Sequence, residues 1–151
     1  FEIALGELSW AMVRGAIYSA GFLVIMVAMG LTSAGWALLA FPASLLVGFA
    51  FGALGMSLST FMRSWQDFDL MGSAQYALFL FSGTFVPPDS YPAALRVIVE
   101  LTPLYHSVEL LRAISMGSAG WPALGHAGYL LAATLLGLTV AGQRMGKLLL
   151  K

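Results

Sequence analysis

The sequence has no cysteine and very little charge. Its 151 residues include seven Lys and Arg and seven Asp and Glu, so only 9% of the chain is charged, whereas about 25% is usual in soluble globular domains. The absence of cysteine excludes disulfide bonds and metal sites built from thiolates. Because the net charge is zero, the chain lacks the basic surface of nucleic-acid-binding domains, and we expect no nucleic-acid partner.

Long stretches of the sequence contain no charged residue at all. Residues 15–62 and residues 70–88 contain no Asp, Glu, Lys, Arg or His, and residues 113–143 contain only His126 among these types. A helix of about 20 apolar residues crosses the hydrocarbon core of a bilayer, because each residue adds about 1.5 Å and the core is about 30 Å thick. The chain is therefore predicted to be an all-α integral membrane protein.

Four transmembrane helices are expected, at residues 12–31, 36–62, 70–86 and 121–140. Residues 1–14 mix charged and apolar positions, a pattern that favours an interfacial helix leading into the first span. Each of the four tryptophans falls near a predicted span end, where the amphipathic indole ring prefers the headgroup region. These are Trp10, Trp36, Trp65 and Trp121.

Basic residues divide unequally between the two sides of this arrangement. The side that holds both ends of the chain has five of them, and the other side has two. Because positive residues favour the cytoplasmic face, both ends are expected to be cytoplasmic, in a multi-pass protein of the cell (plasma) membrane. The five basic residues of that side are Arg14, Arg63, Arg144, Lys147 and Lys151.

Between the third and fourth spans, residues 87–117 are expected to form a short re-entrant helical hairpin on the outer side. Asp89 or Ser90 can cap a first helix with Pro92 in its first turn, and Thr102 and Pro103 can begin a second. Each helix would have about 10 to 14 residues, too few to cross a bilayer. Such a hairpin can act as a lid on a transport pathway. The candidate gate residues are Pro87, Asp89, Arg96, Glu100, Pro103, Tyr105, His106, Glu109 and Arg112.

His106, Glu109 and Arg112 recur at every third position and therefore lie close to one helix face. A metal or proton site is one interpretation, but a catalytic zinc takes three protein ligands and at most two are visible. A polar pair that orients the hairpin, either Glu109–Arg112 or His106–Glu109, is an alternative, and so is contact with a transported molecule or with lipid headgroups. Two functions other than transport remain open at this point. One is an intramembrane metal-dependent enzyme that uses His106 and Glu109, and the other is a membrane scaffold without a transport role.

The second predicted span contains small residues at four-residue spacing. Small residues on one helix face allow two helix backbones to approach closely in lipid. Packing within the chain is the expected role of this face, and a dimer contact is the alternative. The residues are Ser44, Gly48, Gly52 and, further along, Gly55.

Several segments resemble the permease subunits of type-2 ATP-binding-cassette (ABC) exporters, in the branch that includes nodulation-factor, lipooligosaccharide and daunorubicin-type exporters. Members have six spans, so the resemblance implies that the four spans here are the third to sixth and that Phe1 lies inside a longer protein. The chain would then be the C-terminal part of one transmembrane domain. The matching segments are residues 5–10 (LGELSW), 53–56 (ALGM), 82–85 (SGTF) and 103–112 (PLYHSVELLR).

The resemblance also implies a function and partners. The permease would move an amphipathic or lipid-linked molecule outward, such as a lipooligosaccharide or a polyketide drug, and the hairpin would be its outer gate. A second permease copy, identical or related, and membrane lipid would be partners. An ABC ATPase subunit would dock near Glu2, Gly6 and Glu7. The sequence contains no G-x-x-x-x-G-K-[ST] motif, so the chain is not expected to be an enzyme or to bind a cofactor, and ATP and Mg would belong to the ATPase.

Overall fold

The computed structural model describes residues 2–82 and 84–149, and among these it leaves aside the side chains of residues 2–5, 88 and 147–149. The described residues form helices and turns and contain no strand, which confirms the all-α class. The helices are α1 (Glu2–Ala28), α2 (Ala34–Ser59), α3 (Trp65–Leu80), the 3-10 helix η1 (Pro88–Ser90), α4 (Ala93–Glu100), α5 (Pro103–Ser115) and α6 (Trp121–Leu149).

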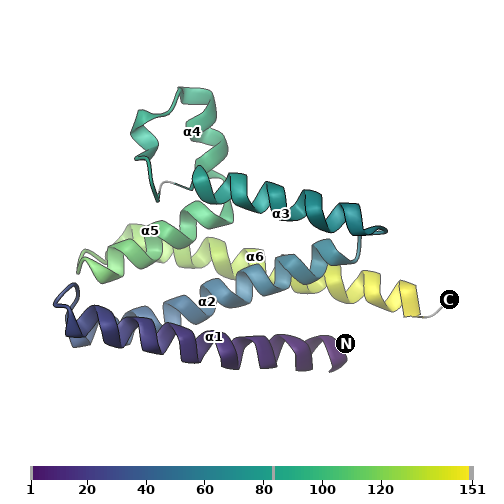
Figure 1. Ribbon diagram of the computed structural model, residues 1–151, viewed down its shortest axis with the longest axis horizontal. Coiled ribbons are helices and arrows are strands. Elements are labelled where there is room, and N and C mark those ends of the chain that lie inside the picture. The colour runs from purple at the N-terminus through teal and green to yellow at the C-terminus, as the bar shows by residue number, and fades with distance from the viewer. Residues whose placement is uncertain (1, 83, 150–151) are drawn as a thin grey trace.

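Helix α2 lies at the centre of the bundle, where it packs against α1, α5 and α6, and α5 also packs against α6 (Figure 1). The start of α1, the end of α6 and the α2–α3 connection lie at one end of the bundle. The α1–α2 and α5–α6 connections lie at the opposite end, and α4 projects from the side of the bundle. Both termini of the described chain therefore lie at the same end.

Among the residues that the structure describes, three helical segments are long and apolar enough to cross a membrane, namely Gly6–Ala28, Ala34–Ser59 and Trp121–Gly146. Helix α3 has 16 residues, which is about 24 Å at 1.5 Å per residue and less than the hydrocarbon thickness of about 30 Å. It begins at Trp65 and ends at Leu80, whereas the third span was expected at residues 70–86. Four complete spans, with a re-entrant hairpin between the last two, therefore remain a prediction.

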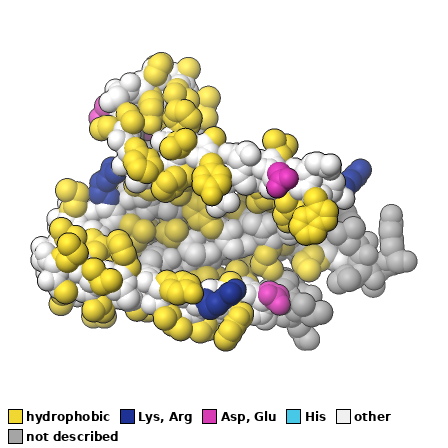
Figure 2. Space-filling model, in the orientation of Figure 1, with side chains coloured by type: hydrophobic (Ala, Val, Ile, Leu, Met, Phe, Trp, Pro, Cys, Tyr) yellow, Lys and Arg dark blue, Asp and Glu magenta, His cyan; other side chains and the backbone are white. Residues whose placement is uncertain are grey.

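The outer surface of the bundle is largely apolar. Hydrophobic side chains cover much of α1 and of the segment around α4 on the face seen in Figure 2, where charged side chains are few. Phe22 and Val24 of α1, for example, are 64% and 67% exposed. In water such a surface would be costly, at about 25 cal/mol for each Å². In lipid it has no such cost, which agrees with a membrane protein.

Two of the helices end with a glycine in the left-handed conformation. Gly30, with φ 71°, follows α1, and Gly117, with φ 70°, follows α5. A residue without Cβ adopts this conformation at no steric cost, and it lets the next backbone N–H reach back into the helix. The N–H of Ser118, for example, donates to the carbonyl of Ala113 at 2.8 Å. Gly117 therefore ends α5, and it is the last residue of the segment expected to form the hairpin.

The hairpin consists of two separate helices, α4 with 8 residues and α5 with 13. Thr102 caps α5 as expected, because its hydroxyl accepts a hydrogen bond from the backbone N–H of Tyr105 at 3.3 Å. Pro103 occupies the first turn, where its missing N–H leaves no hydrogen bond unmade. The bend between the two helices thus lies at Leu101 and Thr102.

The expected cap of α4 at Asp89 or Ser90 is wrong. These two residues belong to η1, and α4 begins at Ala93 with Pro92 in the capping position. Proline disfavours the helical conformation of the residue before it, so Tyr91 separates η1 from α4. The first helix of the hairpin is consequently shorter than expected.

Candidate functional site

The candidate gate begins with a group of ion pairs on the hairpin surface. Arg96 of α4 contacts Asp89 of η1 at 2.9 Å and Glu100 of its own helix at 2.7 Å. Exposed pairs of this kind contribute about 0–1 kcal/mol each. They therefore orient η1 against α4 more than they stabilise the fold. Pro87 lies in the exposed turn that precedes η1.

On α5, Glu109 pairs with Arg112 at 2.8 Å. Of the two polar pairs proposed for this face, the structure thus contains the Glu109–Arg112 pair. His106 lies instead against the neighbouring helix, where its Nδ1 is 2.7 Å from Nδ1 of His126 in α6. Two residues that are 20 positions apart in sequence therefore form a direct imidazole–imidazole hydrogen bond.

Two tyrosines surround the histidine pair. The Tyr129 ring of α6 stacks on His106 with ring centroids 3.8 Å apart and an interplanar angle of 26°. Its hydroxyl donates to the backbone carbonyl of Leu101 at 2.6 Å. Tyr105 presents its ring edgewise to His106 at 5.6 Å and to His126 at 6.1 Å. Together the four rings join the bend of the hairpin to α6.

Burial lowers the pKa of His106, and the nearby His126 lowers that pKa further. Both effects disfavour the charged imidazole, the first by removing water and the second by charge repulsion. A metal could hold two such rings, but a catalytic zinc takes three protein ligands. Within the described part of the chain, no group of three His, Cys, Asp or Glu could hold a metal ion.

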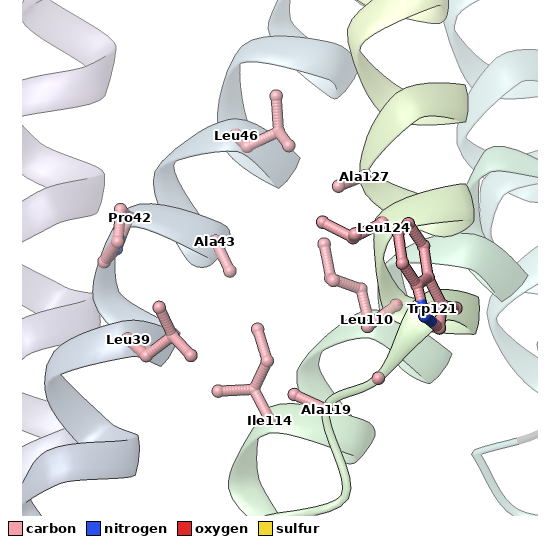
Figure 3. A pocket seen from close by; sticks show the side chains of 12 residues that line it. Leu39, Pro42, Ala43, Leu46, Leu110, Ile114, Ala119, Trp121, Leu124 and Ala127 are labelled. Carbon is pink, nitrogen blue, oxygen red and sulfur yellow. The ribbon is translucent and has the colours of Figure 1, made fainter.

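An apolar groove lies beside the hairpin, between α2 on one side and α5 and α6 on the other (Figure 3). Its volume is about 610 Å³. Every residue along it is apolar, so it favours hydrocarbon over a charged or strongly polar group. We call it the α2–α5–α6 groove. It is lined by Leu39, Pro42, Ala43, Leu46, Leu110, Ile114, Ala119, Gly120, Trp121, Ala123, Leu124 and Ala127.

The small residues of α2 mostly face α1. Ser44 Oγ lies 2.5 Å from Ser19 Oγ. A Cβ added to Gly48 would lie 3.2 Å from Met12 atoms, and one added to Gly52 would lie 2.5 Å from Leu8 Cδ1. Three of the four candidate packing residues therefore lie at the α1–α2 contact. Gly55 does not, because an added Cβ there would meet no atom within 4 Å.

The candidate docking residues for an ATPase lie near the start of α1. Gly6 and Glu7 are exposed in this helix, so both are accessible to a partner. The side chain of Glu2 lies outside the described part of the structure. Their end of the bundle also holds the α2–α3 connection and the end of α6 (Figure 1).

Two contacts between helices in the structure were not predicted from the sequence. Gly137 of α6 lies directly on the α2 backbone, since an added Cβ would be 2.7 Å from the Ala53 carbonyl carbon. The sequence does contain a pattern that indicates this contact. Ala133, Gly137 and Ala141 are small residues with the same four-residue spacing as the packing residues of α2.

The second missed contact joins the end of α6 to the end of α2. The Arg144 guanidinium lies 3.6 Å from the Phe61 ring centroid and donates to the Thr60 carbonyl at 3.5 Å. These residues are more than 80 positions apart in sequence, and no local pattern links them.

Comparisons with known proteins assign this arrangement to a family. The family profile described as "ABC-2 type transporter" matches residues 1–116. Nodulation protein J of Rhizobium leguminosarum bv. trifolii is 34% identical over 117 residues, which cover 77% of this chain and 45% of that protein. Nodulation protein J of Rhizobium meliloti is 31% identical over 118 residues, which cover 78% of this chain and 45% of that protein.

A more distant relative, nodulation protein J of Bradyrhizobium diazoefficiens, is 27% identical over 130 residues, covering 85% of this chain and 50% of that protein. The chain thus spans about half the length of the curated relatives that it matches. No solved structure matches it.

Proposed function

The chain belongs to the ABC-2 type transporter family, and on that premise we propose that it is part of a permease that exports an amphipathic or lipid-linked molecule. The observation that carries this proposal is the extent of the family match. Residues 1–116 include two helices long enough to span a membrane and both helices of the hairpin. The match therefore includes the segment that we assign to the gate.

The charges at the two ends of the bundle support the orientation that we propose for the chain in the membrane. Arg63 and Arg144 lie at the end where α1 begins and α6 ends, and positive residues favour the cytoplasm. We place that end in the cytoplasm and the α1–α2 and α5–α6 connections outside, in the plasma membrane. Helix α5 then runs to the outer end, and the α4–α5 hairpin is the outer gate of the pathway.

The apolar groove supports an amphipathic substrate. An exported lipooligosaccharide or polyketide drug has an apolar part that must leave water or lipid during transport. The α2–α5–α6 groove offers about 610 Å³ of apolar space beside gate helix α5, which suits an acyl chain or a fused ring system. A polar headgroup would then lie towards the ion pairs of the hairpin.

The energy for export would come from a partner. The chain has no phosphate-binding motif, so ATP and Mg would be bound by an ABC ATPase subunit that contacts the start of α1 near Glu2, Gly6 and Glu7. A second permease copy, identical or related, would complete the pathway. Closure of the ATPase would move α1 and, through its packing on α2, the gate.

The direct test is purification of the permease with its ATPase, followed by reconstitution into proteoliposomes. We expect ATP hydrolysis to be stimulated by a lipooligosaccharide and by daunorubicin, which are amphipathic, and not by a free oligosaccharide. Absence of an ATPase from the purified complex would refute the permease assignment. Equal hydrolysis with all three compounds would refute the amphipathic substrate.

The gate is tested by Glu109→Ala in the same preparation. The Glu109–Arg112 pair lies within one helix and is partly exposed, so its loss costs only about 0.2–0.5 kcal/mol and leaves the fold intact. We expect hydrolysis to continue while transport into inverted vesicles is lost. Asp69→Ala, which removes an exposed carboxylate of α3, is the matched control and retains transport. Wild-type transport by Glu109→Ala would contradict the gate.

A further inference from the structure

The bend of the hairpin is attached to α6 by a small set of contacts. His106 bonds to His126, and Tyr129 both stacks on His106 and binds the carbonyl of Leu101. Leu101 is the C-cap of α4, and the next residue caps α5. The contacts therefore hold both hairpin helices at the point where they meet. Any change that weakens the histidine pair acts directly on this attachment.

The geometry of the pair limits how many protons it accepts. A separation of 2.7 Å between the two Nδ1 atoms leaves room for one hydrogen, so one ring donates and the other accepts. A first added proton binds at the Nε2 of the donor ring and leaves the bond in place. A second added proton must occupy the accepting Nδ1. Two N–H groups and two positive charges then face each other, and the bond is lost.

The surroundings give a second charge little compensation. On α5, the Glu109 carboxylate is already paired with Arg112, and on α4 the Glu100 carboxylate is paired with Arg96. The backbone carbonyl of Glu100 favours a proton on His106, but burial and the nearby His126 oppose that proton more strongly.

The other elements around α5 supply no acid to balance a second charge. Helix α6 contributes His126 and Tyr129, and α5 itself contributes Tyr105, none of which is an anion at neutral pH. Helix α3 contributes Tyr76, which lines a cavity together with Pro103. Helix α2 contains no titratable side chain between Ala34 and Ser59.

We propose that His106 and His126 form a proton-operated latch, which holds the hairpin on α6 until both rings are charged and then releases it. The latch would regulate the outer gate, and in that respect it rests on the proposed function.

The direction of the pH effect follows from the closed geometry. In the closed state burial lowers the pKa of His106, and His126 lowers it further. In the open state the pKa of His106 returns towards the ordinary value of about 6.5 for histidine. The closed state therefore binds fewer protons than the open state, so closing is fully favoured above about pH 6.5 and weakens as the pH falls below it. Acidification outside the cell would open the gate.

The test measures the position of the hairpin directly. Because the chain has no native cysteine, spin labels can be attached to Val97→Cys of α4 and Leu135→Cys of α6, both exposed positions. Distances between the labels are measured by pulsed electron paramagnetic resonance on the full chain in lipid nanodiscs, at pH 8 and pH 5, which bracket the titration of histidine. We expect a longer and broader distance distribution at pH 5.

Two variants identify the cause. His126→Asn keeps a side-chain amide that can bond to His106 Nδ1 but cannot be charged, so its distances should change less with pH than those of the wild type. Asp69→Asn, which removes an exposed carboxylate of α3 outside the hairpin, is the control and should keep the wild-type response. His106→Asn replaces His126→Asn if the latter fails to fold, as judged by size-exclusion chromatography.

Identical wild-type distances at pH 8 and pH 5, or a pH response of wild-type size in the Asn variants, would overturn the latch. Because the measurement needs neither ATP nor substrate, such a result would leave the proposed export function standing. A failed ATPase assay would likewise leave the latch standing.

Discussion

Replacement of Gly137 by Ala tests the close contact of α6 with α2. A Cβ at this position would lie 2.7 Å from the carbonyl carbon and 2.8 Å from the carbonyl oxygen of Ala53. Both atoms belong to the backbone and cannot rotate away. To restore a contact of 3.4 Å, the two helices must separate by roughly 0.7 Å. Ala53 is fully buried, so the separation disturbs packing on both sides of α2.

Overpacking of this kind costs about 1–3 kcal/mol. Replacement of Gly by Ala within a helix also stabilises the helix by up to about 1 kcal/mol, because Ala has the higher helix propensity. Gly55→Ala is the matched control, because it receives the same propensity gain and an added Cβ there meets no atom within 4 Å. The difference between the two variants therefore isolates the helix–helix clash.

The assay is thermal unfolding of both variants in the same detergent, followed by tryptophan fluorescence. Each kcal/mol changes Tm by about 2–4 °C for a protein of this size. We expect the Tm of Gly137→Ala to be lower than that of Gly55→Ala, by an amount that corresponds to about 1–3 kcal/mol. Equal melting temperatures would show that α6 does not press on the α2 backbone, and the packing described here would be refuted.

Thr102→Ala removes the cap of α5 and should destabilise the protein by about 1 kcal/mol, as measured by thermal melting. Thr102→Ser keeps the hydroxyl and should keep wild-type stability. An Ala variant as stable as the wild type would contradict the cap. Tyr129→Phe keeps the ring but loses the hydrogen bond to the Leu101 carbonyl, which should lower the free energy of unfolding by about 0.5–1.5 kcal/mol. Its hydrogen exchange should be faster around Leu101, and unchanged exchange would contradict the attachment to α6. A double-mutant cycle of Arg144→Met with Phe61→Leu should give a coupling of about 0.5–1 kcal/mol, and additive effects would show that the two side chains do not interact.

Features set by neighbouring residues were predictable from the sequence. Thr102 followed by Pro103 marked the start of α5 correctly, because a cap and a first-turn proline depend only on local backbone geometry. Gly117 marked its end for the same reason. The Arg96–Glu100 pair followed from a spacing of four residues on one helix. Long charge-free runs predicted the membrane class, since the bilayer selects for composition and length.

Features that depend on the register between helices were not predictable. His106 and His126 meet because α5 and α6 pack side by side at one particular register, and the sequence of each helix carries no sign of that register. The Arg144–Phe61 contact has the same origin. Pro92 is a different case, since its effect on Tyr91 is local and could have been used to place the start of α4.

In the proposed topology, the hairpin faces outward while both ends of the bundle face the cytoplasm. A membrane-impermeant maleimide applied to intact cells tests this directly, because the native chain offers it no thiol. Val97→Cys in α4 should be labelled in intact cells, and Asp69→Cys in α3, near the α2–α3 connection, only after permeabilisation. Labelling of Asp69→Cys in intact cells, with Val97→Cys protected until permeabilisation, would contradict this topology.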